Sequence, residues 1–229
     1  MSDQGNQNSG HGVSGASATA DATLWDDLRA TDNPEASYKA WLGMLARRYA
    51  QPDSNLYDLG CSLGAVALAM QSTVRTPGVR IIAVDNAPDM IRGLEARLKA
   101  SPADEGAPPI DPLRQDILDT PIERASVTVL NFTLQFVPPD RRSALVARIA
   151  AGTSPGGVLL LSEKIRFEDP AEETLQTDWH HAFKRARGYS DLEIARKREA
   201  LENVLRPETL ATHRRRLEQA GFTRVYRWF

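Results

Sequence analysis

The stretch Tyr57-Asp58-Leu59-Gly60-Cys61-Ser62-Leu63-Gly64-Ala65-Val66 predicts a strand that ends in a glycine turn and passes directly into a helix. A short apolar run closes at Leu59, and the apolar residues from Val66 onward have helical spacing. Gly60 and Gly64 remove side chains where the backbone must turn or approach a ligand. We therefore expect a nucleotide-like ligand at this turn.

A second predicted strand, Arg80–Asp85, ends in an acid 21 positions after Gly64. A carboxylate at this place can accept hydrogen bonds from both hydroxyls of a ribose. No Lys-Ser or Lys-Thr pair follows the second glycine, and the three-glycine dinucleotide fingerprint is incomplete, so a ligand without phosphates fits best. The glycine turn alone is also compatible with a plain strand-to-helix connection.

Composition limits the partners of this 229-residue chain. Its 28 basic and 30 acidic residues give a net charge of −2, which favours neither direct nucleic-acid binding nor a membrane surface. Cys61 is the only cysteine, which excludes an intramolecular disulfide and is compatible with a cytoplasmic location. Residues 1–22 lack an apolar period and predict a disordered tail, and no stretch approaches the roughly 20 apolar residues of a membrane-spanning helix. Residues 23–229 are expected to form one α/β domain.

Predicted strands alternate with predicted helices along this domain. The alternation favours a doubly wound, mostly parallel sheet with helices on both faces. Pro102–Pro112 predicts a loop, and Pro155-Gly156-Gly157 predicts a turn. The helix before the first strand is expected over Leu24–Tyr49, with Pro34 as a break or a start. The other predicted strands are Leu113–Ile117, Val127–Asn131, Val158–Ser162 and Phe222–Phe229.

Polar residues end four of the predicted strands, namely Asp58, Asp85, Asp116 and Asn131. Right-handed crossovers bring the carboxyl ends of parallel strands to one rim of the sheet, where ligands bind near the switch in strand order. We expect these four residues to lie at that rim.

A helical insertion is predicted over residues 165–221, before the last strand. Its helices are expected at Ala171–Arg187, Asp191–Leu205 and Pro207–Ala220. It is longer than an ordinary crossover, and insertions of this size cover a site, mediate assembly, or do both.

With these segments in place, the chain resembles the carboxy-S-adenosyl-L-methionine synthase family, which has the Rossmann-like fold of class I S-adenosylmethionine-dependent methyltransferases. The resemblance runs from about Leu42 to Phe229, and its segments after Glu163 make it specific. The segments that carry it are Tyr57–Ala65, Asp85-Asn86, Leu130–Phe136, Leu161–Lys164, His180-His181, Phe183–Arg185, Gly188–Ser190, Lys197-Arg198 and Leu201–Val204.

The resemblance implies a transferase that converts S-adenosyl-L-methionine and prephenate into carboxy-S-adenosyl-L-methionine and phenylpyruvate. The product is the carboxymethyl donor for a wobble uridine of tRNA, so the resemblance also implies a functional link to a tRNA carboxymethyltransferase. A homodimer in the cytoplasm is expected on the same ground.

The resemblance also implies roles for individual residues. A guanidinium fork suits a carboxylate, so Arg198 is expected to bind the carboxylate of the new ligand and is the candidate catalytic residue. The residues expected to bind the cofactor are Gly60, Cys61 and Ser62 at the turn, Asp85 and Asn86 at the ribose and adenosine side, Asp116 and Ile117 at the adenine, and Asn131 at the sulfonium end.

Several interpretations stay open. Arg198 is also compatible with a solvated basic helix face, and prephenate could meet Lys184, Arg185 or Arg187. His180 and His181 do not predict a metal site, because neighbouring helix positions point about 100° apart. An ordinary methyltransferase, acting on a small molecule or tRNA, and a catalytically weak S-adenosylmethionine-binding protein are the alternative functions.

Overall fold

The structure, a computed structural model, describes residues 34–202 and 205–228. The expected tail, residues 1–22, and the part of the expected first helix before residue 34 lie outside the described residues. The described residues fall into two units, with the boundary between Trp41 and Leu42. Helix α2 (Pro34–Tyr49) begins at its proline and crosses this boundary. Every contact discussed below lies within the second unit.

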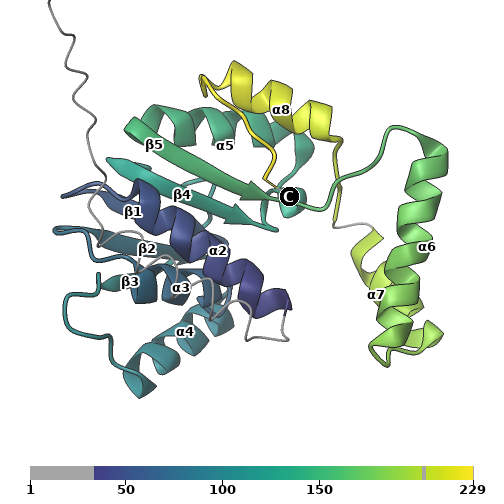
Figure 1. Ribbon diagram of the computed structural model, residues 1–229, viewed down its shortest axis with the longest axis horizontal. Coiled ribbons are helices and arrows are strands. Elements are labelled where there is room, and N and C mark those ends of the chain that lie inside the picture. The colour runs from purple at the N-terminus through teal and green to yellow at the C-terminus, as the bar shows by residue number, and fades with distance from the viewer. Residues whose placement is uncertain (1–33, 203–204, 229) are drawn as a thin grey trace, which may run out of the picture. The chain divides into compact units, whose positions relative to one another are not determined.

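Within the described residues, five parallel strands form one sheet in the order β3-β2-β1-β4-β5 (Figure 1). The order reverses between β1 and β4, which creates the switch point at which ligands of open α/β sheets bind. The doubly wound parallel sheet predicted from the sequence is confirmed. The strands are β1 (Asn55–Leu59), β2 (Arg80–Asp85), β3 (Ile110–Arg114), β4 (Ala125–Asn131) and β5 (Thr153–Ser162).

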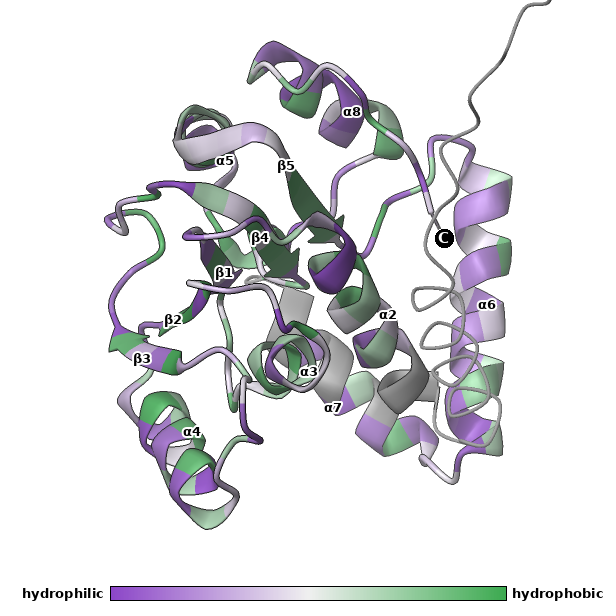
Figure 2. Cartoon of the chain, turned by 60° about the vertical axis from the view of Figure 1, so that its left-hand side comes forward, coloured by the Kyte–Doolittle hydropathy of each residue, from purple (hydrophilic) through white to green (hydrophobic). Residues whose placement is uncertain are grey.

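Three of the four connections between these strands contain a helix, and the one from β3 to β4 is a loop. Right-handed connections place α3 (Ala65–Thr73) and α4 (Pro88–Ala100) on one face of the sheet and α5 (Pro139–Gly152) on the other. Proline stands in the first turn of α4 and of α5, where its missing N–H costs no helical hydrogen bond. Figure 2 shows the hydrophobic colour on β4 and on the end of β5, whereas the edge strand β3 is mixed. The buried core residues come mainly from β1, β2, β4 and the inner faces of α3, α4 and α5.

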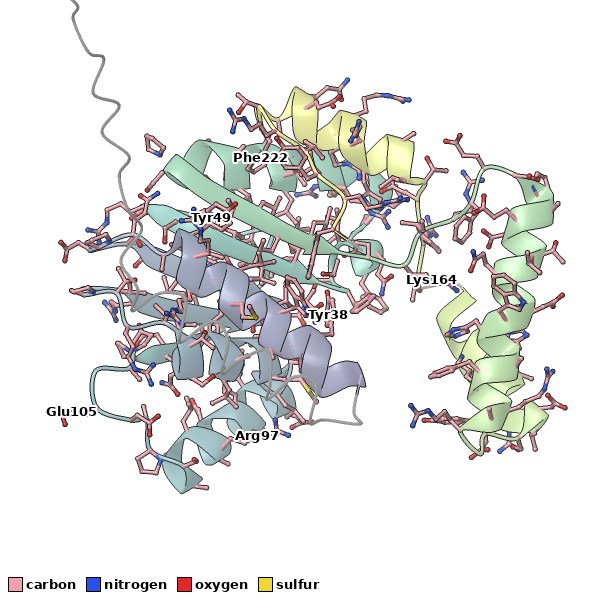
Figure 3. All side chains as sticks on the ribbon, in the orientation of Figure 1. Tyr38, Tyr49, Arg97, Glu105, Lys164 and Phe222 are labelled. Atoms are coloured by element: carbon pink, nitrogen blue, oxygen red, sulfur yellow. The ribbon has the colours of Figure 1, made fainter. Side chains whose placement is uncertain are left out.

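The chain leaves the sheet after β5, at Lys164 (Figure 3). It then forms α6 (Pro170–Ala186) and α7 (Asp191–Glu202), which contact one another, and α8 (Leu210–Gln219), which packs on α5. Ile165 and Glu208 form an isolated parallel bridge, and the Arg166 N–H donates to the Glu208 carbonyl at 3.0 Å. The outgoing and returning chain therefore meet beside the sheet.

A buried ion cluster holds the returning chain. Arg142, fully buried on α5, forms an ion pair with Glu208 at 2.7 Å and donates to the carbonyls of Val137 and Gln135. Arg216 of α8 binds the other Glu208 oxygen at 2.7 Å. Burial acts to raise the pKa of Glu208, but the hydrogen bonds from the two arginines outweigh it and hold the pKa below its usual range.

Strand β3 begins at Ile110, earlier than the predicted Leu113, so the end of the predicted loop belongs to the sheet. Pro112 lies inside this strand because β3 is an edge strand, and a residue without an N–H is tolerated where one side of the strand has no partner. As a consequence, Asp116 follows the strand by two residues rather than lying within it.

The turn predicted at Pro155-Gly156-Gly157 is wrong, since these residues belong to β5. Thr153 pairs with Ala125, but the next partner of β4, Val127, pairs with Val158. The extra residues form a bulge in this edge strand, and Gly156 accommodates it with a φ of 79°.

The prediction of a last strand is also wrong over residues 222–228, where the chain forms no strand. Phe222, labelled in Figure 3, instead packs with Leu217 and Ala220, at the end of α8, against the core. The apolar residue that suggested a strand is thus satisfied by helix packing.

Candidate functional site

The glycine turn after β1 has a left-handed backbone at three of five positions. The φ angles of Gly60, Ser62 and Gly64 are 81°, 50° and 76°. The N–H groups of Gly60 and Cys61 both donate to the Val84 carbonyl, at 2.8 and 2.9 Å, which ties the turn to β2. The turn that follows β1 is therefore held in place by hydrogen bonds to the backbone of β2.

Neither glycine of this turn has room for a side chain. A Cβ atom on Gly60 would lie 2.4 Å from the Thr133 side chain, after β4, and one on Gly64 would lie 2.3 Å from the Leu94 side chain of α4. The turn thus lies directly against the segment that follows β4. The prediction that Gly60 and Gly64 let the backbone turn is confirmed by their positive φ angles.

Asp85 fastens the turn to the end of β2. Its Oδ2 accepts a hydrogen bond from the Ser62 N–H and its Oδ1 accepts one from the Ala87 N–H, both at 2.9 Å. Each carboxylate oxygen keeps a second lone pair that can accept a further bond. Asn86 is exposed beside it. The structure therefore brings together the turn and the acid that the sequence analysis paired.

The loop with Asp116 and Ile117 is shaped by local and distant hydrogen bonds. Asp116 is exposed and its Oδ1 accepts from the Leu118 N–H at 2.8 Å, while Ile117 is buried. Arg148 of α5 donates to the carbonyls of Ile117, at 2.7 Å, and Leu118. The role of Arg148 could not be predicted from the sequence, because it depends on packing between elements distant in sequence.

Asn131 ends β4, next to the switch point, and a strained residue follows it. Phe132 has a φ of 54°, which is uncommon for a residue with a side chain, and its N–H donates to the Ser162 carbonyl at 2.7 Å. The following Thr133 is the residue that contacts Gly60. The segment after β4 therefore packs on the glycine turn through the Thr133 side chain.

Glu163, directly after β5, holds this segment. Its Oε1 accepts from the N–H groups of Thr133 and Leu134 at 3.1 and 2.7 Å, and its Oε2 accepts from that of Gln135 at 3.0 Å. These N–H groups open the short 3-10 helix η1 (Leu134–Phe136). No role was predicted for Glu163 from the sequence. Its place directly after an apolar strand marks it as a rim residue, but it does not show which N–H groups the side chain meets.

Asp58 lies in the core rather than at the rim where it was expected. It is 2% exposed and accepts from the Ala67 N–H at the start of α3, at 3.0 Å. Burial raises its pKa from 3.8 to about 7, although the Ala67 bond opposes the rise, and the charge of Asp85 adds to it. Burial also raises the pKa of the Cys61 thiol, and the nearby carboxylates of Asp58 and Asp85 add to the rise. The thiol is therefore protonated and inert.

The shifted pKa of Asp58 predicts a pH-dependent stability. Between 3.8, its ordinary pKa, and about 7, its folded pKa, the folded state holds the proton more tightly, so the free energy of unfolding falls as pH rises through this window. We expect Asp58 to contribute a loss of about 2 kcal/mol between about pH 5.5 and about pH 8, a loss that the Asp58→Asn variant lacks.

Urea unfolding at the two pH values measures this difference. Asp89→Asn, which changes an exposed aspartate of α4, serves as the matched control and should keep the wild-type dependence. Equal pH dependences in wild type and Asp58→Asn would contradict the assignment.

The basic residues of the insertion differ in their surroundings. Arg198 lies in α7, and its side chain lies outside the described residues. Arg185 forms an ion pair with Asp191 at 2.7 Å, and the guanidinium of Arg187 lies 5.4 Å from the ring centre of Phe183. Arg185 and Arg187 are thus engaged within the α6–α7 hairpin itself.

No metal cluster is found among the residues that the structure describes. The rings of His180 and His181, neighbours on α6, are tilted by 48° with centres 6.4 Å apart. Over the same residues, no helix combines the length and the apolar character needed to cross a membrane.

The parallel sheet, its switch point and the glycine turn bound to the acid of the next strand define the class I S-adenosylmethionine-dependent methyltransferase fold. A family model described as a methyltransferase domain matches residues 56–157. The solved cyclopropane synthase MmaA2 from Mycobacterium tuberculosis has the same fold, with a TM-score of 0.61 and 17% identity over 82% of this chain and 61% of that one.

Two relatives narrow this class. The carboxy-S-adenosyl-L-methionine synthase of Trichlorobacter lovleyi is 54% identical over 82% of this chain and 76% of its own length. The enzyme of the same name from Marinobacter nauticus is 53% identical over 81% of this chain and 73% of its own. The chain belongs to the carboxy-S-adenosyl-L-methionine synthase family.

Proposed function

We propose that this protein converts S-adenosyl-L-methionine and prephenate into carboxy-S-adenosyl-L-methionine and phenylpyruvate. The observation that carries the proposal is the 54% identity, over most of both chains, with a relative named for that product. The product would supply the carboxymethyl donor for a tRNA wobble uridine and so link this protein to a tRNA carboxymethyltransferase. The small-molecule substrates give the protein itself no need to bind nucleic acid.

The proposed cofactor site follows the rim of the sheet from β3 to β4. The backbone of Gly60, Cys61 and Ser62 lies against the ligand, and the remaining lone pairs of Asp85 accept from the ribose hydroxyls. The other assigned contacts are Asn86 at the adenosine side, Asp116 and Ile117 at the adenine, and Asn131 at the sulfonium. The hydrogen bonds that join Ser62 to Asp85 and Arg148 to Ile117 support this arrangement, because they fix the site before the ligand arrives.

Arg198 is the proposed selectivity residue. Its guanidinium would bind the carboxylate that distinguishes the product from S-adenosylmethionine, and a charge-assisted bond of this kind contributes roughly 1.5–3 kcal/mol. That free energy corresponds to a preference of about tenfold or more. The family resemblance implies a reaction that needs no protein base. The residues of the chain would then orient the reactants, compensate charge and exclude water.

The proposed assembly is a cytoplasmic homodimer. Helix α6 supports it with an apolar stripe at helical spacing, Leu175, Trp179 and Phe183, which are 47%, 60% and 55% exposed. Helical spacing of four residues places these side chains on one face, which a second copy could cover. Sedimentation velocity over a range of concentrations tests the assembly.

The proposed reaction is tested by mass spectrometry of the nucleotide released from purified, heat-denatured protein after incubation with S-adenosylmethionine and prephenate. A prephenate-dependent species heavier by one carboxyl group is expected. If only unmodified S-adenosylmethionine is released, the proposed synthase reaction is contradicted and a binding protein is favoured. S-adenosylhomocysteine that accumulates with an acceptor would favour a methyltransferase.

Isothermal titration calorimetry with the two ligands tests Arg198. Arg198→Ala should reduce the affinity for carboxy-S-adenosylmethionine about tenfold or more and leave that for S-adenosylmethionine unchanged. Arg196→Ala, which removes an exposed cation of the same helix, is the matched control and should keep both affinities. Equal affinities of wild type and Arg198→Ala for the carboxylated ligand would refute the role.

A further inference from the structure

Glu163 makes an unusual set of contacts for a side chain outside the assigned site. Its two oxygens accept from three consecutive backbone N–H groups, those of residues 133, 134 and 135. N–H groups at the start of a helical turn have no partner within the turn, so this carboxylate satisfies all three at once. It belongs to the residue after β5, and it fixes the segment after β4.

That segment contains backbone strain. Phe132 has a left-handed backbone, with a φ of 54°, and such strain persists only where the surroundings hold it. Here it is held from both sides, by the bond from the Phe132 N–H to the Ser162 carbonyl and by the bonds to Glu163.

Gln135 completes this support. Its side-chain amide is buried, donates to the Phe132 carbonyl at 3.4 Å and accepts from the Lys164 N–H at 3.3 Å. Two polar side chains thus close the backbone of residues 132–135. The strained residue lies between Asn131, at the proposed sulfonium end, and Thr133, which contacts Gly60.

A carboxylate is a costly way to hold a loop for stability alone. Burial raises the pKa of Glu163 to about 7, against the three N–H bonds and the charge of Arg142, so the ionised group is desolvated at a net cost. Strain and desolvation that meet beside a ligand site are typical of a segment selected for its function rather than its stability.

We propose that Glu163 is a positioning residue, whose carboxylate holds residues 131–135 in the backbone conformation that presents Asn131 to the sulfonium end of the cofactor. The proposal rests on the proposed cofactor site, and it assigns Glu163 no contact with the ligand. Because Asn131 is assigned to the sulfonium, loss of the Glu163 carboxylate should weaken the binding of a ligand with the sulfonium charge more than that of a ligand without it.

The test compares the affinities of the full-length protein for S-adenosylmethionine and for S-adenosylhomocysteine, which lacks the sulfonium charge. Glu163→Gln keeps the shape but turns an N–H donor toward the backbone N–H groups, so we expect it to reduce the preference for the sulfonium ligand about tenfold. Glu163→Asp keeps the carboxylate but shortens the side chain by one methylene, so its preference should lie between those of wild type and Glu163→Gln. It carries the test if Glu163→Gln fails to fold.

Glu168→Gln, at an exposed position five residues further along, is the matched control and should keep the wild-type preference. A parallel loss of both affinities, or no loss, in the Glu163 variants would overturn the positioning role, because a purely structural defect does not distinguish the two ligands. If wild type binds both ligands but makes no carboxylated product, the proposed reaction fails while the ratio of affinities still decides the role of Glu163.

Discussion

An Asp85→Ala variant is expected to bind S-adenosylmethionine about 100-fold more weakly than wild type or worse. The substitution would remove the proposed acceptor of two ribose hydroxyls, each a charge-assisted bond worth roughly 1.5–3 kcal/mol. It would also release the N–H groups of Ser62 and Ala87, which Asp85 holds at 2.9 Å. Isothermal titration calorimetry measures the loss directly.

Asp85→Asn separates these two contributions. It keeps one oxygen that can hold a backbone N–H but loses the charge and one acceptor, so its affinity should lie between those of wild type and Asp85→Ala. Asp89→Ala, four residues further along, removes an exposed acid and should change the affinity by less than about threefold. An Asp85→Ala protein with wild-type affinity would exclude the ribose contact.

The second large effect concerns stability. Arg142→Leu should lower the free energy of unfolding by about 3–5 kcal/mol, because the loss of one member of a buried ion cluster leaves its partners uncompensated. Arg142 is fully buried, and its removal deprives Glu208 of one of two cations and the Val137 carbonyl of its donor. The Gln135 carbonyl also loses a bond from Arg142 but keeps the one from the Arg206 N–H, at 3.1 Å.

Urea unfolding tests this expectation. Arg141→Leu changes the exposed neighbour on α5 and should cost less than about 0.5 kcal/mol. Adding Glu208→Leu to Arg142→Leu should cost less than the sum of the two single changes, since the second removes the charge that the first left unpaired. Additive losses would show that the two residues do not stabilise one another.

The sequence predicted strands best where an apolar run is sharply bounded. Arg80–Asp85 matches β2 at both ends, because a Pro-Gly pair precedes its apolar residues and an acid closes them. Prolines misled the prediction where their neighbours form edge strands, at Pro112 and Pro155, because whether a strand is at an edge depends on the whole sheet.

The site was predictable where its residues lie at strand ends and not where function comes from contacts distant in sequence. Asp58 precedes the last residue of β1, and both Asp58 and Leu59 are buried, so the core extends to the carboxyl end of this strand. The sequence does not show how deeply a strand end is covered, because that depends on the elements packed around it. Glu163 meets its three N–H partners across 28 to 30 positions, and no local pattern reveals such a contact.

The bridge between Ile165 and Glu208 gives the insertion an evolutionary freedom. Because the chain departs and returns at one point, the helical hairpin between them is a closed excursion that the sheet does not need for its own strand order. The entropy of closing a loop grows slowly with length, and doubling it costs only about 0.6 kcal/mol. The hairpin can therefore be lengthened, shortened or exchanged at little cost. Proteins with the same cofactor-binding sheet can acquire new substrates by replacement of this hairpin alone.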